Sequence, residues 1–129
     1  MKYLIIFLSL LLISSPVIGD NNKGETLYKW VTSSGVVWKV IGDKNINHLY
    51  KGDVVNGVPN GVGILTSPNG SKYIGEFKDG LPNGQGTDIF ADGSKGIGEF
   101  REGSPWNITH RDKNGNIIVK FVNGKEIKP

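Results

Sequence analysis

The chain has 129 residues, with 15 Lys and Arg against 12 Asp and Glu, a formal net charge of +3 and no cysteine. This near balance of charge argues against a dedicated nucleic-acid binder, which would concentrate Lys and Arg on one face. The absence of cysteine excludes disulfides and thiolate metal ligands, and the length fits one domain after an N-terminal targeting segment.

Residues 1–19 are predicted to be a signal peptide rather than part of the fold. Lys2 gives a short basic start, the run 3–13 is almost wholly apolar, and a Ser-Ser-Pro sequence ends it. Gly19 then offers a small residue at a cleavage position, so we expect a mature chain from Asp20 that is periplasmic or extracellular. The apolar run is shorter than the about 20 residues of a membrane span. Uncleaved anchoring is the alternative.

Residues 26–49 are predicted to form a hairpin that caps the N-terminal end of the fold. The segment is rich in β-branched and aromatic residues and turns at a Ser-Ser-Gly sequence. We expect Trp30 and Trp38 to cover the uncovered end of the first repeat, because the terminal units of an array hide its edges.

Three tandem segments follow without a gap, at 50–72, 73–95 and 96–109, and their period is 23 residues. The residues that recur in register are Gly52, Gly75 and Gly98; Gly57, Gly80 and Gly103; Pro59, Pro82 and Pro105; and, in the first two copies, Gly61 with Gly84 and Gly63 with Gly86. A fixed period of this length indicates a repeat array whose units stack on their neighbours. It predicts a scaffold or binding surface rather than a catalytic pocket.

Each repeat is predicted to run strand, turn, strand, turn. In the second copy, alternation over residues 73–78 places Tyr73 and Phe77 on one face. Residues 79–83 are predicted to be a five-residue turn and residues 84–90 the returning strand. Since no segment combines helical spacing with a helix start signal, we expect the mature chain to be nearly all β.

The glycines inside the strands are expected to make room for aromatic rings. A glycine such as Gly75 would let a ring from an adjacent strand lie over the backbone, and two matching columns, Tyr50 with Tyr73 and Phe77 with Phe100, would form ladders of rings. Cross-strand aromatic pairs contribute roughly 0.2–1 kcal/mol each. These ladders would carry much of the stability of a sheet that has little two-sided core.

The repeats resemble the MORN family (membrane occupation and recognition nexus), whose unit reads Y-x-G-x-[WF]-x-x-G-x-x-x-G-x-G. The second copy matches this pattern at Tyr73, Gly75, Phe77, Gly80, Gly84 and Gly86. The first copy departs from it at Val54, and the third at Gly96, Asn107 and Thr109, so the third is predicted to be a fading or capping repeat. The resemblance implies one hairpin per repeat and an elongated, single-layer, twisted antiparallel sheet.

The C-terminal part is predicted to extend the same sheet. Residues 115–124 echo residues 70–80 and are interpreted as a degenerate half-repeat, while Trp106 is expected to close the sheet rather than stay exposed. We therefore expect a single domain over residues 20–129.

Candidate catalytic, metal and cofactor sites fail on spacing. The pair Gly61 and Gly63 lacks the third glycine and the helix of a dinucleotide loop. His48 and His110 are the only histidines, and His110 near Asp112 is interpreted as a pair of solvated loop residues rather than part of a charge relay. We predict no catalytic residue, no metal site, no cofactor and no small-molecule substrate, so the chain is not expected to be an enzyme.

The recurring aromatic residues are either a binding site or the internal packing of the sheet. In one interpretation their rings line a shallow groove for a peptide strand, a helix or lipid; in the other, which is favoured, they are the packing of the sheet itself. The candidate binding residues are Tyr50, Tyr73, Phe77 and Phe100.

The function expected from the sequence is that of an exported, non-enzymatic interaction module. It would bind a protein partner or itself through its sheet face or its edges, and the resemblance adds that such arrays dimerise end to end. The alternative is peripheral association with anionic membrane lipid, and glycan binding is a third reading without a distinguishing motif. The lipid-contact residues of the alternative are Lys72, Lys78, Lys95 and Arg101. The acidic neighbours that weaken it are Glu76, Asp79, Glu99 and Glu102.

Overall fold

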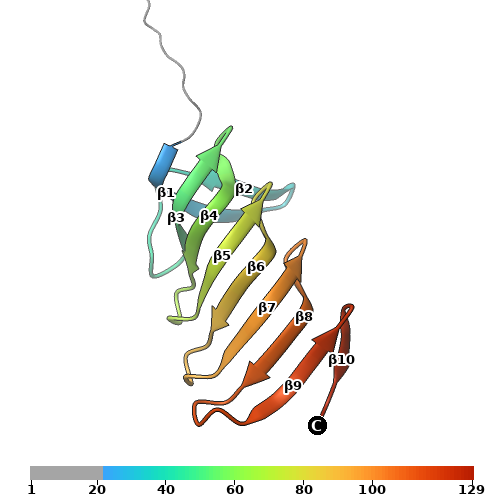
Figure 1. Cartoon of the computed structure of the whole chain (residues 1–129). Coiled ribbons are helices and arrows are strands. Elements are labelled where there is room, and N and C mark those ends of the chain that lie inside the picture. Colours follow the sequence, from blue (N-terminus) through green and yellow to red (C-terminus); the bar gives the residue numbers. More distant parts are fainter. Residues whose placement is uncertain (1–21) are drawn as a thin grey trace, which may run out of the picture.

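The computed structural model describes residues 22–129, which form one open antiparallel sheet of ten strands (Figure 1). The strands are β1 (Asn22–Thr32), β2 (Gly35–Lys39), β3 (His48–Val55), β4 (Val58–Thr66), β5 (Lys72–Lys78), β6 (Leu81–Ile89), β7 (Lys95–Arg101), β8 (Ser104–Arg111), β9 (Ile117–Val122) and β10 (Lys125–Ile127). The predicted all-β sheet of tandem hairpins is confirmed. The signal peptide predicted over residues 1–19 lies outside the described residues.

Consecutive strands are neighbours in the sheet, except that β1 lies between β2 and β3. Each of the three repeats supplies one hairpin: β3 with β4, β5 with β6, and β7 with β8. Within the part of the chain that the structure describes, no helix is long and apolar enough to span a membrane.

The hairpins turn tightly along one margin of the sheet, here called the tip margin. In the second repeat Asp79 and Gly80 connect β5 to β6, with φ angles of 51° and 86°. Two positive φ angles in a two-residue loop are the signature of a type I′ turn, whose twist matches that of the strands it joins. The predicted five-residue turn over residues 79–83 is therefore wrong. β6 begins at Leu81, three residues before the strand that was predicted.

Five-residue loops connect successive hairpins along the opposite margin, here called the loop margin. In the loop 67–71, the backbone N–H of Ser67 donates to the carbonyl of Ser71 over 2.8 Å, and that of Gly70 donates to Ser67 over 2.9 Å. The same pair of bonds closes the loops 90–94 and 112–116. Every repeat therefore enters the sheet at the same level, which keeps equivalent residues in rows across the strands.

The two faces of the sheet differ completely. On the ring face, cross-strand neighbours form a row that passes from β1 to β9 through Leu27, Tyr50, Leu65, Tyr73, Asp88, Gly96, His110 and Val119. The opposite side, here called the open face, carries the alternate residues, such as Ile64, Ile74 and Ile97. Side chains alternate between the two sides of a strand, so this register decides which residues meet.

Aromatic rings on the ring face form the core. Tyr50, Phe77, Tyr73 and Phe100 contact one another in that order, edge to face, with centroid distances of 4.9, 5.1 and 5.0 Å. Trp38 extends the series, 6.1 Å from Tyr50. The predicted ladders of like rings are wrong, because Leu65 of β4 stands between the two tyrosines. The actual series alternates tyrosine with phenylalanine, and each such pair adds about 0.5–1.5 kcal/mol beyond its buried area.

Glycines lie directly beneath these tyrosines. A Cβ on Gly63 would overlap the ring of Tyr50, and a Cβ on Gly86 would overlap the ring of Tyr73. Gly75, which was expected to lie under a ring from an adjacent strand, faces the backbone of β6, where a Cβ would lie 2.5 Å from the carbonyl oxygen of Gln85 and 2.8 Å from the hydroxyl of Tyr73 on its own strand. The rings thus sit on the second strand of their own hairpin.

The ends of the array are closed differently. β2 turns behind β3 and β4 (Figure 1), which brings Trp38 onto the ring face as predicted for a cap. Trp30 does not share this role, because it lies on the opposite side of β1 from Leu27, which is on the ring face. The indole Nε1 of Trp30 donates to the carbonyl of Ile41 over 2.9 Å. At the other end Trp106 is half-buried, and a Cβ on Gly124 in the last turn would lie 2.8 Å from its ring.

Candidate interaction surface

The four predicted binding rings lie together on the ring face but present almost no surface. Tyr50, Tyr73, Phe77 and Phe100 are 0, 4, 4 and 2 % exposed. Their burial favours the interpretation that they are the packing of the sheet, and contact with a partner stays a prediction for them.

The phenol groups of the two tyrosines are also engaged within the sheet. Tyr50 donates to the carbonyl of Asp53 over 2.6 Å, and Tyr73 donates to that of Glu76 over 2.9 Å. Burial raises the pKa of both phenols to about 12, with smaller contributions from nearby carboxylates. The neutral, hydrogen-bonded form of each tyrosine is therefore the one that the fold requires.

The open face carries an apolar row that nothing in the described chain covers. Ile64 pairs with Ile74 across β4 and β5, and Thr87 pairs with Ile97 across β6 and β7. The three isoleucines are 40, 39 and 56 % exposed. Because one face of an antiparallel sheet is normally polar when it meets water, a continuous row of β-branched residues there is unexpected.

Basic side chains form a second row, on the loop-margin side of the isoleucines. Lys72 and Lys95 precede Ile74 and Ile97 by two residues, and Lys95 pairs with Arg111 of β8. Arg111 was not singled out from the sequence. The only signal that would have found it is the register of β7 against β8, which an irregularity interrupts.

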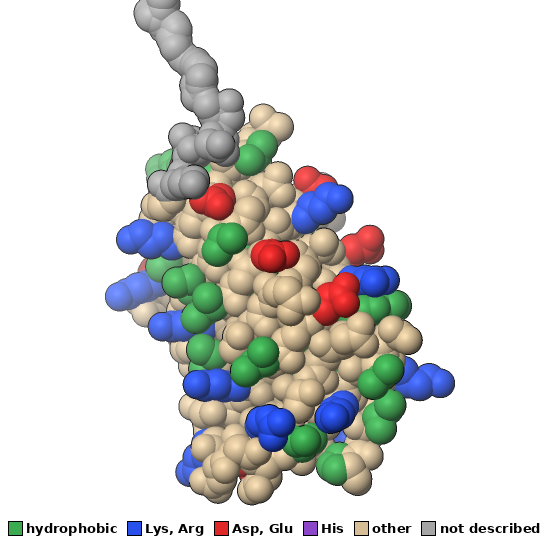
Figure 2. Space-filling view, in the orientation of Figure 1, with side chains coloured by type: hydrophobic (Ala, Val, Ile, Leu, Met, Phe, Trp, Pro, Cys, Tyr) green, Lys and Arg blue, Asp and Glu red, His purple; other side chains and the backbone are tan. Residues whose placement is uncertain are grey.

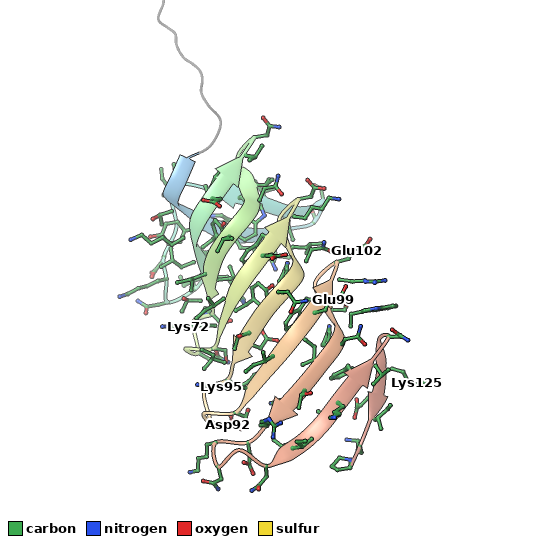
Figure 3. All side chains as sticks on the ribbon, in the orientation of Figure 1. Lys72, Asp92, Lys95, Glu99, Glu102 and Lys125 are labelled. Carbon is green, nitrogen blue, oxygen red and sulfur yellow. The ribbon has the colours of Figure 1, made fainter. Side chains whose placement is uncertain are left out.

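Acidic side chains form the third row, on the tip-margin side, two residues after Ile74 and Ile97 and, in the first repeat, two residues after Lys51. The row contains Asp53, Glu76 and Glu99, which recur at the period of the repeat. Figure 3 shows Lys72 and Lys95 at one side of the sheet and Glu99 at the other. In the space-filling view, Lys and Arg follow the left margin, hydrophobic side chains lie beside them, acidic ones lie further to the right, and more Lys and Arg lie at the right margin (Figure 2).

The carboxylates of the acidic row also hold the backbone at a bulge. One residue of β5, Glu76, stands opposite three residues of β6 between the pairs Gly75 with Gly86 and Phe77 with Pro82. The bulge frees the N–H of Gln85, which donates to Oε1 of Glu76 over 3.3 Å. The N–H of Val62 donates to Oδ2 of Asp53 in the same way, over 3.0 Å. Sequence reasoning missed this role, although the recurrence of an acid three residues after each tyrosine signals it.

The predicted lipid-contact residues do not form one patch. Lys72 and Lys95 lie towards the loop margin, whereas Lys78 and Arg101 lie at the tip margin, with the acidic row between the two pairs. Arg101 is also engaged: its Nε lies 3.1 Å from Oε2 of Glu99, and its guanidinium lies 4.3 Å from the ring of Trp106. Hydrogen bonds from Asn107 and Arg101 hold the pKa of Glu99 below its ordinary value.

A shallow hollow lies beside the basic row. It has a volume of ≈ 490 Å³, and its lining includes three cations, Lys95, Arg111 and Lys113, over a floor of Ile97 and Thr109. Asp112 is also at this hollow, but its carboxylate accepts the backbone N–H groups of Asn114 and Asn116 within its own loop. The hollow therefore gathers three cations at the loop-margin side of the open face.

On the ring face, the third repeat has Gly96 where the first two have a tyrosine, and a pair of polar side chains lies beside it. Asp88 and His110 flank Gly96 in one row, and His110 stacks on Phe90 at 5.0 Å. Burial raises the pKa of Asp88, and the nearby His110 opposes this. The prediction that His110 is a solvated loop residue is wrong, because it lies half-buried in β8. Among the residues described, no group of three or more His, Cys, Asp or Glu side chains is arranged to hold a metal.

Comparison with known families agrees with this geometry. The MORN repeat model matches residues 50–72 and 73–95, which cover most of the β3–β4 and β5–β6 hairpins. The chain therefore contains MORN repeats over residues 50–95, and MORN repeats in general are modules that contact proteins or membranes. No curated protein matches the chain in sequence.

Proposed function

We propose that this chain is an exported, non-enzymatic scaffold that binds a protein partner through the open face of its sheet. The observation that carries the proposal is the row of isoleucines, Ile64, Ile74 and Ile97, which is exposed between a basic and an acidic row. The larger apolar side chains, the rings, are already buried against one another. Apolar surface rimmed by charge is typical of protein-binding sites.

The sheet edges are a further route for a partner. β2 and β10 are the outermost strands, so each offers unpaired backbone groups to an added strand. An edge-bound partner would leave the isoleucines exposed, which separates the two routes experimentally.

Site-specific photo-cross-linking in the source cells tests the proposal. A photoreactive residue at Ile74 or Ile97 should give adducts of defined mass, whereas one at Val31, which is 78 % exposed but lies on β1, should not. Adducts from all three positions alike, or from none of them, would contradict binding through the open face.

Binding to anionic lipid is a second candidate, supported by the hollow that Lys95, Arg111 and Lys113 line. Each basic residue near an anionic surface contributes about 1 kcal/mol. The test is co-sedimentation with anionic and neutral vesicles at low and physiological salt, using the protein and the variant Lys95→Glu/Arg111→Glu. Binding that survives physiological salt and is lost in the variant supports this candidate. Equal sedimentation of the two proteins would remove it.

Export is proposed on the apolar run and small cleavage residue near the N-terminus. Mass spectrometry of the protein isolated from its source cells should then give the mass of residues 20–129. A mass that still includes residues 1–19 would favour an uncleaved anchor over a cleaved signal.

A further inference from the structure

We propose that the partner of the open face is a second copy of this chain, stacked face to face about a two-fold axis that runs along the row of isoleucines. The inference rests on the proposed function, since it names the partner of that face. It differs from end-to-end assembly, because both sheet edges stay free.

The charges on the open face are arranged with opposite signs about the isoleucines. Lys72 and Glu76 each lie two residues from Ile74, in opposite directions along β5, and Lys95 and Glu99 flank Ile97 in the same way. Two residues of a strand span about 6.7 Å, so the basic and acidic rows are about 13 Å apart with the apolar row midway.

This arrangement selects one symmetry. Rotation by 180° about an axis along the apolar row exchanges its two sides, so the basic row of one copy lies over the acidic row of the other. Rotation about an axis parallel to the strands would leave each row on its own side and place lysine on lysine. Opposite charges across an interface fix its orientation and suppress the alternatives. A two-fold contact must also be self-complementary, which holds for the charged rows and the isoleucines but not for Lys51 and Lys120, which lie near the two ends of the central row and would face their own copies.

The period of the repeat extends the match along the array. Lys72 and Lys95 are separated by two strands, as are Glu76 and Glu99. The two rows therefore have the same spacing, about 9.6 Å, set by the distance between strands. When one charged pair is in register, the next pair is also in register.

The size of the open face suits a stable dimer. The row of cross-strand neighbours on this face spans eight strands, from Thr26 on β1 to Lys120 on β9. At about 4.8 Å per strand, and with six residues of each strand in contact, it measures about 34 by 20 Å. That is close to the about 800 Å² per partner of a standard interface. A net charge of only +3 opposes the approach of a second copy weakly.

A membrane fits this face less well than a second copy. An anionic bilayer that met Lys72 and Lys95 would also meet Glu76 and Glu99, which the same strands hold about 13 Å away. A second copy gives both rows an opposite charge at once.

Sedimentation velocity and light scattering of the purified protein test the proposal by charge exchange. The wild type should form a dimer that weakens with salt. The basic-row variant Lys72→Glu/Lys95→Glu and the acidic-row variant Glu76→Lys/Glu99→Lys should each dimerise at least about tenfold more weakly. An equimolar mixture of the two variants should restore a dimer, because each then offers the charge that the other has lost. The control Lys44→Glu/Lys128→Glu carries the same change of charge off this face, since Lys44 lies between β2 and β3 and Lys128 contacts Glu126, the partner of Phe121 on the ring-face side, so it should dimerise like the wild type.

The acidic-row variant removes a carboxylate that accepts the N–H of Gln85, so its folding is checked by thermal melting. If it does not fold, Ile74→Asp/Ile97→Asp takes its place, and this variant should be monomeric. A monomeric wild type at low salt, a dimer that the basic-row variant leaves intact, or a control variant as weak as the basic-row variant would overturn the inference.

The outcomes separate this inference from the proposed function. A monomeric wild type whose positions 74 and 97 still cross-link to a different protein would end the inference and keep the proposed function. A monomer that gives no adducts from these positions would contradict both.

Discussion

At the scale of single residues, glycine and tyrosine act as pairs. The ring of Tyr73 covers Gly86 and its hydroxyl reaches back to the carbonyl of Glu76, so the tyrosine fixes both the packing and the bulge of its hairpin. Tyr50 repeats the arrangement over Gly63 with the carbonyl of Asp53. These glycines mark the places where a tyrosine ring packs directly on the backbone. Such packing lets a single-layer sheet form a core on one face.

Gly86→Ala should destabilise the fold by about 1–3 kcal/mol, because the added methyl group overlaps the ring of Tyr73 in a packed core. Gln85→Ala is the matched control: it is the exposed neighbour on the same strand, and only its backbone N–H is used. Chemical denaturation of the two variants gives the comparison. Equal stability of both would show that Tyr73 does not lie on Gly86.

Phe77→Ala should cost about 3–5 kcal/mol, since Phe77 is 4 % exposed and contacts the rings of both Tyr50 and Tyr73. Phe90→Ala removes the same side chain from a position that is 39 % exposed and should cost about 1 kcal/mol. Thermal melting of the pair tests whether the series of rings carries the stability. A Phe77→Ala protein as stable as Phe90→Ala would refute it.

Stability should fall as the pH rises from 10 to 12. The pKa of Tyr73 is raised from 10.0 to about 12, so the folded state keeps a proton that the unfolded chain has lost in this window. The contribution is fully present below pH 10 and is lost as the pH passes through about 12. Unfolding in urea at several pH values measures the slope, which Tyr73→Phe should reduce. An unchanged slope in that variant would exclude Tyr73 as a source.

At the scale of elements, the hairpin is the unit, and its turn sets its twist. Asn56, Asp79, Glu102 and Asn123 all have positive φ angles near 50° and each precedes a glycine that also has positive φ. Asparagine and aspartate tolerate this conformation, whereas glutamate does not favour it. The third hairpin therefore contains the least suitable turn residue.

Glu102→Asn should stabilise the protein by about 0.5–1 kcal/mol, because it relieves a φ angle of 48° without altering a core contact. The backbone N–H of residue 102, which donates to Oδ1 of Asn83, is unaffected. Thermal melting measures the gain, and Glu102→Val should give a loss. If Glu102→Asn melted below the wild type, the turn would not be the weak point of this hairpin.

The sequence predicts the hairpins well and their details less well. Strand faces such as that of Tyr73 and Phe77 are correct because alternation is reliable within one short strand. The turn after β5 was predicted too long, because Leu81-Pro82-Asn83 has the composition of a turn although the two preceding residues complete it. At the bulge, Glu76 stands opposite three residues of β6, so counting along the chain no longer tells which residues meet.

The bulge also explains a glycine column that no ring covers. Gly84 has a φ angle of 109°, and a Cβ there would overlap the carboxylate of Glu76. The sequence shows the glycine and the acid as separate recurring features. Only the register shows that both belong to one bulge, in which the carboxylate of Glu76 accepts the N–H of Gln85 in place of a backbone carbonyl.

At the scale of the whole molecule, the two faces of the sheet differ in what they bury and what they expose. The ring face buries its aromatic side chains, whereas the open face presents isoleucines between rows of opposite charge. The rings that the sequence singled out as candidate binding residues lie on the filled side of the sheet, because sequence shows which residues are apolar but not which face is already packed; partner contact stays a prediction for them. The rows on the open face become visible only when the register aligns the strands.

Cysteine accessibility tests this division most directly, because the chain contains no cysteine of its own. Single cysteines at Ile74 and Ile97 on the open face, at the buried Ile108 on the ring face and at Val31, which is exposed on the ring-face side of β1, would be labelled in dilute and in concentrated protein. In dilute protein, positions 74, 97 and 31 should react fast and position 108 slowly, since Ile108 is 5 % exposed. On concentration only positions 74 and 97 should become protected. Fast labelling at position 108, or no protection at 74 and 97 when the protein has associated, would contradict the account.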